Sequence, residues 1–177
     1  MVNKRVDLSS AQIEHLKSLV TGLVSTNETV LDQHGRDESA IPPVRPSAVV
    51  MPQSTEEVSK VLAYCNSEKI PVVAFGAGSS LEGHVLPLFG GVSLDLTQMN
   101  KIVEIRPDDL VVRVQPGVHR VALNEKLSSS GLSPFTLILC GVSKSFVSGW
   151  RYLLFQIQCH NKGQVSFFLV EVDKRSS

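Results

Sequence analysis

A glycine- and serine-containing loop at positions 76–83 is the part of the chain whose composition could support chemistry. Gly76 and Gly78 permit positive φ angles and let a ligand approach the backbone closely. The hydroxyls of Ser79 and Ser80 can donate hydrogen bonds to anionic oxygens. Successive backbone amides in such a turn form a concave anion-binding nest. The composition therefore predicts a loop that holds a phosphate or pyrophosphate group through its backbone.

Two familiar phosphate-binding motifs do not fit this loop. The dinucleotide fingerprint GxGxxG requires a third glycine where the chain has Leu81. The P-loop pattern requires Lys and then Ser or Thr where the chain has His84 and Val85. The lysine and the magnesium-binding hydroxyl of an ATPase are therefore missing. A Gly-Ser loop alone is also typical of a plain surface turn, so the elements around it must decide.

The residues before the loop predict a strand–helix–strand unit that positions it. Residues 48–51 and 71–75 are short apolar runs, and each predicts a buried strand. Between them lies a capping box, in which the Ser54 hydroxyl and the Glu57 carboxylate satisfy each other's backbone donors. The helix that follows is expected to place four apolar side chains on one face: Val58, Val61, Leu62 and Cys65. Two strands joined by a helix within about thirty residues form a βαβ unit with a right-handed crossover.

Further elements are expected on both sides of this unit. Ser9 or Ser10 caps a first helix with an apolar face of Ile13, Leu16, Val20 and Leu23. In the polar stretch 26–46, a helix is excluded by Pro42, Pro43 and Pro46. Later strands are expected at 92–96, 102–105 and 110–114, and a helix at 120–129. The predicted fold class is α+β, with a small, mostly parallel sheet followed by part of an antiparallel sheet.

The bulk composition excludes several classes of protein. The 177 residues have a formal net charge of zero, which argues against binding nucleic acid by neutralising its phosphates. The three cysteines are scattered and form no metal-binding or disulfide pattern. No run of about 18 apolar residues occurs, so no membrane span is expected. Residues 1–10 show no secretory or import segment, and the sequon at Asn27 is interpreted as a chance match.

Several motifs around the loop resemble one family of flavoproteins. In chain order they are HGRDES at 34–39, RPSAVVMPQSTEEV at 45–58, FGAGSSLEGH at 75–84, GGVSLDL at 90–96 and VQPGV at 114–118. This series resembles the PCMH-type FAD-binding domain of the vanillyl-alcohol-oxidase family, including the D-lactate dehydrogenases that pass electrons to cytochrome c. The resemblance covers residues 26–131. It implies an incomplete domain, with a βαβ subdomain and part of a second, antiparallel subdomain.

The resemblance implies a non-covalent FAD site built on the loop. The residues that it places around the pyrophosphate are Phe75, Gly76, Ala77, Gly78, Ser79 and Ser80. Gly83 and His84 would lie at the end of the loop near the flavin, and Pro52 beside the cofactor at the end of the first strand. Relatives with covalently bound flavin carry a histidine where this chain has Gly78 and Ser79, so no covalent bond is expected. His84 is either a donor close to the flavin or an anchor of the loop, and no catalytic residue is assigned.

Other reactive side chains have simpler explanations. Cys65 lies on the apolar helix face and is expected to pack in the core. His34 and the neighbouring Asp37 and Glu38 lack the spacing of metal ligands. They are expected to form structural hydrogen bonds, and no metal site is assigned. The pair at 56–57 is expected to belong to the capping box and a solvated helix end rather than to acid–base catalysis.

The family pattern breaks near Leu132. Bulky apolar runs follow at 135–140, 150–157 and 165–172, and the glycine-rich segment that the family places against the flavin is missing. Three regions are therefore expected: an N-terminal helix and approach segment (1–43), the first part of the FAD-binding domain (44–132) and a divergent tail (133–177). The tail is interpreted as a retained intron, an alternative exon or a frameshift. The simpler interpretation is three strands that complete a sheet.

The function that the resemblance implies is that of the FAD-binding part of an oxidoreductase. Such relatives oxidise D-lactate to pyruvate and pass the electrons to cytochrome c, often in mitochondria. Because the residues for the substrate lie outside this chain, the chain alone is not expected to catalyse the reaction. Two alternatives stay open: a non-catalytic fragment that binds FAD or associates with a partner, and a relative that oxidises glycolate or 2-hydroxyglutarate. A cytoplasmic location is the alternative to a mitochondrial one.

Overall fold

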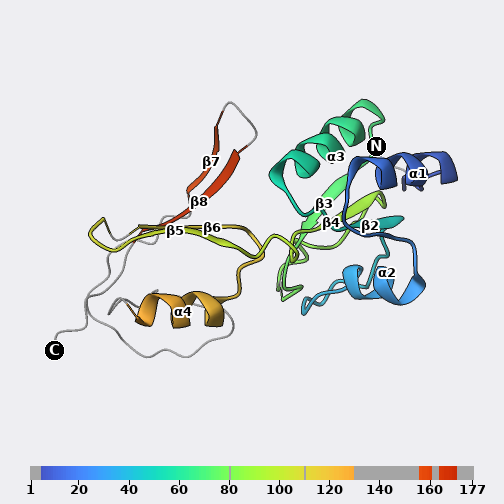
Figure 1. Cartoon of the computed structure of the whole chain (residues 1–177). Coiled ribbons are helices and arrows are strands. Elements are labelled where there is room, and N and C mark those ends of the chain that lie inside the picture. The colour runs from blue at the N-terminus through green and yellow to red at the C-terminus, as the bar shows by residue number, and fades with distance from the viewer. Residues whose placement is uncertain (1–4, 80, 110, 130–155, 161–163, 171–177) are drawn as a thin grey trace. The chain divides into compact units, whose positions relative to one another are not determined.

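The computed structural model describes residues 5–79, 81–109, 111–129, 156–160 and 164–170, the last two ranges by their backbone alone. The chain divides into two compact units, Met1–Met99 and Asn100–Ser177 (Figure 1). Each unit contains a four-stranded sheet and helical segments, so the predicted α+β class is confirmed. The predicted phosphate loop belongs to the first unit.

A sheet of four strands organises the first unit. The strands are β1 (Val24–Ser25), β2 (Ala48–Val50), β3 (Val72–Phe75) and β4 (Val92–Asp95). Their order is β1-β2-β4-β3. β2 and β3 are both parallel to β4, which lies between them, and β1 is antiparallel to β2. The two strands of the predicted βαβ unit are thus parallel, as expected, with β4 inserted between them.

β3 is an edge strand of this sheet, not the buried strand that its apolar run predicts. Val72, Val73 and Phe75 are half-buried, and Ala74 is exposed. β4, in contrast, is buried along its whole length. The prediction fails because burial of a short apolar strand depends on its position in the sheet, which its composition does not encode.

Helices cover both faces of the sheet (Figure 1). α1 (Ser10–Leu19) and α3 (Thr55–Ser67) lie on one face, and α2 (Glu28–His34) lies on the other. Successive side chains of β4 follow this division, because Leu94 joins the core on the first face whereas Asp95 contacts His34 of α2. The core on the first face consists of Leu16, Val20, Val50, Val61, Cys65, Ile70, Val92 and Leu94.

α2 lies inside the stretch 26–46, for which a helix was excluded, so that prediction is wrong. Asn27 caps the helix, because its side-chain oxygen accepts a hydrogen bond from the Thr29 amide at 3.0 Å. The helix ends at His34, before Pro42, and the prolines never enter it. Asn27 thus has a structural role that is independent of the glycosylation sequon.

The predicted apolar helix faces are confirmed at their centres and wrong at their margins. Val61 and Cys65 of α3 are buried, and burial raises the pKa of the Cys65 thiol to about 11, as expected of a core cysteine. Leu23 is 57% exposed and Leu62 is 44% exposed. α1 ends at Leu19, so its spacing does not extend to Leu23. Leu62 is rotated by about 100° around the helix from the residue before it, which takes it away from the sheet.

The start of α3 differs from the predicted capping box. The Ser54 hydroxyl accepts a hydrogen bond from the Glu57 amide at 3.3 Å, as expected. The Glu57 carboxylate instead accepts from the Thr21 amide at 3.1 Å, the Thr21 hydroxyl at 2.6 Å and the Gln53 amide at 2.8 Å. Glu57 is buried and ties α3 to the end of β2, so its predicted place at a solvated helix end is wrong.

The second unit contains an antiparallel sheet. The strands are β5 (Ile102–Arg106), β6 (Val111–Val114), β7 (Gln156–His160) and β8 (Gln164–Val170), in the order β5-β6-β8-β7. α4 (Arg120–Ser128) forms a small core through Leu123 and Leu127 with Val112. The elements predicted between residues 102 and 129 are confirmed. β8 overlaps the apolar run at 165–172, β7 overlaps the run at 150–157 only at residues 156–157, and 135–140 lie outside the described residues.

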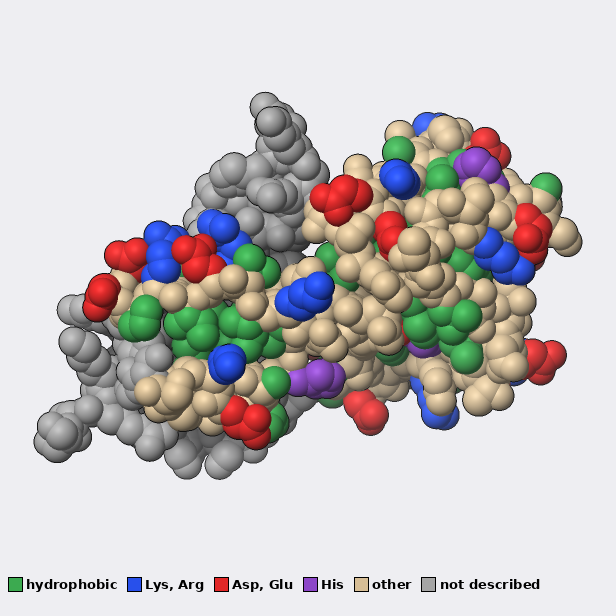
Figure 2. Space-filling model, viewed as in Figure 1, with side chains coloured by type: hydrophobic (Ala, Val, Ile, Leu, Met, Phe, Trp, Pro, Cys, Tyr) green, Lys and Arg blue, Asp and Glu red, His purple; other side chains and the backbone are tan. Residues whose placement is uncertain are grey.

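Charged side chains on β5 and β6 pair with one another. Arg106 lies 3.4 Å from Glu104 and 3.1 Å from Asp109, and Arg113 lies 3.5 Å from Glu104. Figure 2 shows acidic and basic side chains next to each other on this surface. Such pairing agrees with the neutral composition, because it offers no continuous basic patch on these two strands.

Glu57→Ala is expected to lower the free energy of unfolding by about 2 kcal/mol, because two backbone amides and a hydroxyl lose their shared acceptor. Urea unfolding followed by circular dichroism measures the change. Glu56→Ala removes the exposed neighbouring carboxylate and is the matched control. The control should change stability by less than about 0.5 kcal/mol.

The effect of Glu57→Ala should also depend on pH. Burial raises the pKa of Glu57, but the hydrogen bonds from Thr21 and Gln53 outweigh burial and lower the pKa below its ordinary value of 4.5. The stabilisation is therefore present above that value and is lost as the pH falls through the lower pKa of the folded state. The stability difference between wild type and variant should be full at neutral pH and shrink in acid. A difference that stays constant in acid would contradict this role.

Candidate cofactor site

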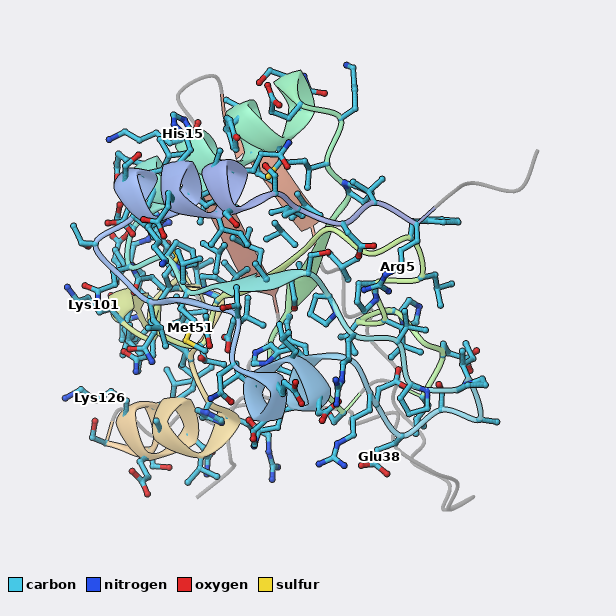
Figure 3. The ribbon with its side chains drawn as sticks, turned by 90° about the vertical axis from the view of Figure 1, so that its right-hand side faces the viewer. Arg5, His15, Glu38, Met51, Lys101 and Lys126 are labelled. Atoms are coloured by element: carbon cyan, nitrogen blue, oxygen red, sulfur yellow. The ribbon has the colours of Figure 1, made fainter. Side chains whose placement is uncertain are left out.

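The carboxyl ends of three parallel strands lie at one edge of the first unit's sheet. β2 leads through Met51, labelled in Figure 3, to the buried Pro52. β3 ends at Phe75 and β4 ends at Asp95, and these two residues lie opposite each other in the strand register. Ligands of parallel sheets bind outside this edge. The structure thus brings predicted cofactor residues to a place where a ligand site is expected.

The loop after β3 turns tightly around the ring of Phe75. Gly78 has a φ of 68°, which lies in the left-handed region that favours glycine. A Cβ atom added to Gly78 would lie 2.8 Å from Cζ of Phe75, so the ring lies directly against the backbone of the turn. Gly76 is different, because no atom of the described residues lies within 4 Å of a Cβ added there. The described part of the chain therefore leaves open space on this side of Gly76.

This loop fits an anionic group such as a pyrophosphate. Residues 76–79 carry no charged side chain, and Ala77 and Ser79 are exposed. Recognition would therefore come from consecutive backbone amides and from the Ser79 hydroxyl. Small side chains leave room for the phosphate oxygens, which a bulkier loop would exclude. A chain without net charge can bind a phosphate in this way.

A buried pair of side chains, His34 and Asp95, lies next to the start of the loop, because His34 contacts Phe75. His34 is 5% exposed and Asp95 is 4% exposed. Nε2 of His34 lies 2.9 Å from Oδ2 of Asp95, and Nδ1 lies 2.8 Å from the carbonyl oxygen of Val30. The imidazole packs on the ring of Phe75 with 4.2 Å between the ring centroids. Asp95 also accepts a hydrogen bond from the Thr97 amide at 2.8 Å.

Hydrogen bonding favours the charged form of both members of this pair. Burial lowers the pKa of His34, but the hydrogen bonds to Asp95 and to the Val30 carbonyl outweigh it and raise the pKa overall. Burial raises the pKa of Asp95, but the hydrogen bonds from His34 and Thr97 outweigh it and lower the pKa overall. Because both partners of the imidazole are acceptors, both ring nitrogens must donate, as they do in imidazolium.

His34 therefore has the structural hydrogen-bonding role that was predicted for it. Within the described part of the chain, no three His, Cys, Asp or Glu side chains come together as metal ligands. The pairing of His34 with a carboxylate and a backbone carbonyl accounts for its burial.

The residues predicted to contact FAD lie in different surroundings. Those at the carboxyl edge are Pro52, Phe75, Gly76, Ala77, Gly78 and Ser79. Ser80 lies outside the described residues. Gly83 has a φ of 73° and faces Ile41, whose Cδ1 would lie 2.5 Å from an added Cβ. His84 is exposed, and its contact with a cofactor stays a prediction.

Asp95 and Thr97 belong to this edge of the sheet, and the sequence interpretation did not assign them. His34 and Asp95 are 61 residues apart, and no local spacing rule predicts their contact. One signal was available in the sequence. Asp95 is a carboxylate at the end of an apolar strand, and a carboxylate buried there requires a partner.

Comparison with known families identifies the class of protein to which this site belongs. Residues 46–145 match the FAD binding domain family, which is more than half of the chain. The chain therefore belongs to this family of flavoproteins, and FAD is the cofactor of the domain. The resemblance to PCMH-type flavoproteins is confirmed. The matched range runs past Leu132 to residue 145, and the starting point of the divergent tail stays a prediction.

Individual relatives agree with this assignment. The probable mitochondrial D-lactate dehydrogenase of Danio rerio is 38% identical over 157 residues, which cover 83% of this chain and 32% of that protein. Glycolate oxidase subunit GlcD of Escherichia coli K12 is 31% identical over 164 residues, which cover 89% of this chain and 32% of that protein. The solved structure of 4-ethylphenol oxidase from Gulosibacter chungangensis matches with a TM-score of 0.64 and 28% identity over 73% of this chain and 27% of that one. The chain thus spans about a third of the length of these relatives.

Gly78→Ala is expected to lower the free energy of unfolding by about 1–2 kcal/mol, because a left-handed backbone is costly for a residue with a Cβ. The added methyl group would also displace the ring of Phe75. Gly76→Ala is the matched control, since it adds the same methyl group in open space. It should change stability by less than about 0.5 kcal/mol. Urea unfolding of both variants tests this, and equal losses would show that Phe75 does not hold the turn.

Proposed function

We propose that this chain is the FAD-binding part of an oxidoreductase that converts D-lactate to pyruvate and passes the electrons to cytochrome c. The observation that carries the proposal is the loop after β3, an open turn without charged side chains that is held against Phe75. It lies in a chain of the FAD binding domain family. When bound, FAD would supply the acceptor for a hydride from C2 of the 2-hydroxy acid.

The contribution of this chain would be to bind and orient the cofactor. We assign the pyrophosphate to the backbone amides of the loop from Phe75 to Ser80, and the cofactor's flank to Pro52. Gly83 and His84 complete the proposed set near the flavin. The cofactor is held non-covalently in this proposal, because the loop has no histidine to bond to flavin at Gly78 or Ser79.

The names of the relatives support a 2-hydroxy acid as the substrate. One is a D-lactate dehydrogenase and another a subunit of glycolate oxidase. D-lactate is favoured because that relative is 38% identical to this chain, compared with 31% for the other. We place the residues that bind the substrate in the part of the relatives that this chain does not cover.

The same relative supports a mitochondrial location, since its name includes one, and a cytoplasmic location is the alternative. None of the helices in the described ranges is long and apolar enough to cross a membrane.

An FAD titration followed by quenching of flavin fluorescence tests the cofactor site. Wild-type protein is expected to bind FAD saturably. Gly76→Trp should weaken binding by about tenfold or more, because the indole would fill the open space over the loop. Ser59→Trp places the same side chain at an exposed position of α3 and is the matched control. A folded wild-type protein that does not bind FAD would refute the proposal.

Anaerobic addition of D-lactate and then of glycolate to the FAD-loaded chain tests whether the residues that bind the substrate lie outside this chain. The flavin absorbance is expected to stay unchanged with both acids, because the substrate residues are placed outside the chain. Reduction by D-lactate would show that this chain contains a substrate site. Reduction by glycolate alone would overturn the assignment of D-lactate.

A further inference from the structure

Three side chains from separate elements form a chain of contacts that ends at the loop. His34 is the last residue of α2, Phe75 the last of β3 and Asp95 the last of β4. The hydrogen bonds at both imidazole nitrogens restrain the ring of His34. The ring of Phe75 contacts this imidazole, with 4.2 Å between the centroids, and its Cζ lies against the turn at Gly78. The conformation of the loop therefore depends on a contact that begins at α2.

We propose that His34 is a positioning residue of the pyrophosphate loop: paired with Asp95, it holds the ring of Phe75 against Gly78 and so keeps the loop amides in place for FAD. This proposal rests on the assignment of the loop to FAD. Neither His34 nor Asp95 touches the cofactor in it, and both act through Phe75. The buried pair thereby joins the fold of α2 to cofactor binding.

The doubly protonated imidazole is required for this arrangement. Asp95 from β4 and the Val30 carbonyl from α2 are both acceptors, and β3 contributes the uncharged ring of Phe75. Loss of one imidazole proton removes one of the two hydrogen bonds and frees the ring. Because the pKa of His34 is raised above its ordinary value of 6.5, this loss occurs as the pH rises through that higher value. FAD affinity is therefore expected to fall in mild alkali.

A second histidine provides a matched control. His15 of α1 stacks on Tyr64 with ring centroids 4.3 Å apart and an interplanar angle of 41°, and the stack of His34 on Phe75 has 4.2 Å and 41°. His15, labelled in Figure 3, is exposed and lies on the opposite face of the sheet from α2. His34→Phe and His15→Phe thus make the same change to two similar ring pairs.

The experiment compares these variants in hydrogen exchange and in FAD titration. His34→Phe should speed exchange of the amides at 72–79 and weaken FAD binding by about tenfold, because a buried partner of Asp95 is lost. His15→Phe should change neither. Asp95→Asn is the second variant: an amide donor can pair with neutral His34, so the contact should no longer depend on protonation of the imidazole. It should also lose the fall of wild-type affinity between about pH 6.5 and pH 9.

The possible outcomes separate the two proposals. Equal exchange and affinity in His34→Phe and His15→Phe would overturn the positioning role, as would a pH dependence that Asp95→Asn retains. If His34→Phe does not fold, the pH profiles of wild type and Asp95→Asn decide. If folded wild-type protein does not bind FAD, the proposed cofactor site fails, and exchange of the loop amides alone decides whether His34 positions the loop.

Discussion

β4 is the constraint on which the first unit depends, because it is hydrogen-bonded in parallel on both sides and buried along its length. Its register fixes β2 and β3 relative to each other, although neither strand contacts the other in the sheet order. Parallel pairing brings the carboxyl ends of all three strands to one edge. The position of the loop after β3 is therefore a consequence of the ladder on β4, and the loop's own sequence decides only its shape.

The polar end of β4 explains why a helix forms in the approach segment. A seven-residue helix is marginal by itself, since helix formation gains little before several turns are complete. α2 is stabilised by its tertiary contacts, because His34 pairs with Asp95 inside and Arg45 hydrogen-bonds Asp32 outside. Without His34, Asp95 would be a buried carboxylate that lacks its charged partner. Removing one partner of a buried ion pair destabilises a protein by roughly 3–5 kcal/mol. The helix and the strand end thus stabilise each other.

The sequence predicts the elements whose signals are local and fails where burial is decided by distant partners. The cap at Ser9, the parallel strands of the βαβ unit and the helix at 120–129 follow from side-chain chemistry and spacing within a few residues. The edge position of β3 and the inward turn of Glu57 do not, because β4 and Thr21 impose them from elsewhere in the chain. The same holds for the site. Its loop was found from composition, whereas the pairing of His34 with Asp95 required the fold.

The loop separates the demands of folding from those of binding at neighbouring residues. The fold itself favours glycine at position 78. The positive φ is costly for other residues, and the ring of Phe75 leaves no room for a side chain. Gly76 has free space at its Cβ position among the described residues, so the packing of the fold does not demand glycine there. A bound phosphate would favour a small residue at this position, since backbone amides bind an anion only where no side chain covers them. The contrast between the two glycines is therefore the one expected if Gly78 serves the shape of the turn and Gly76 serves the proposed ligand.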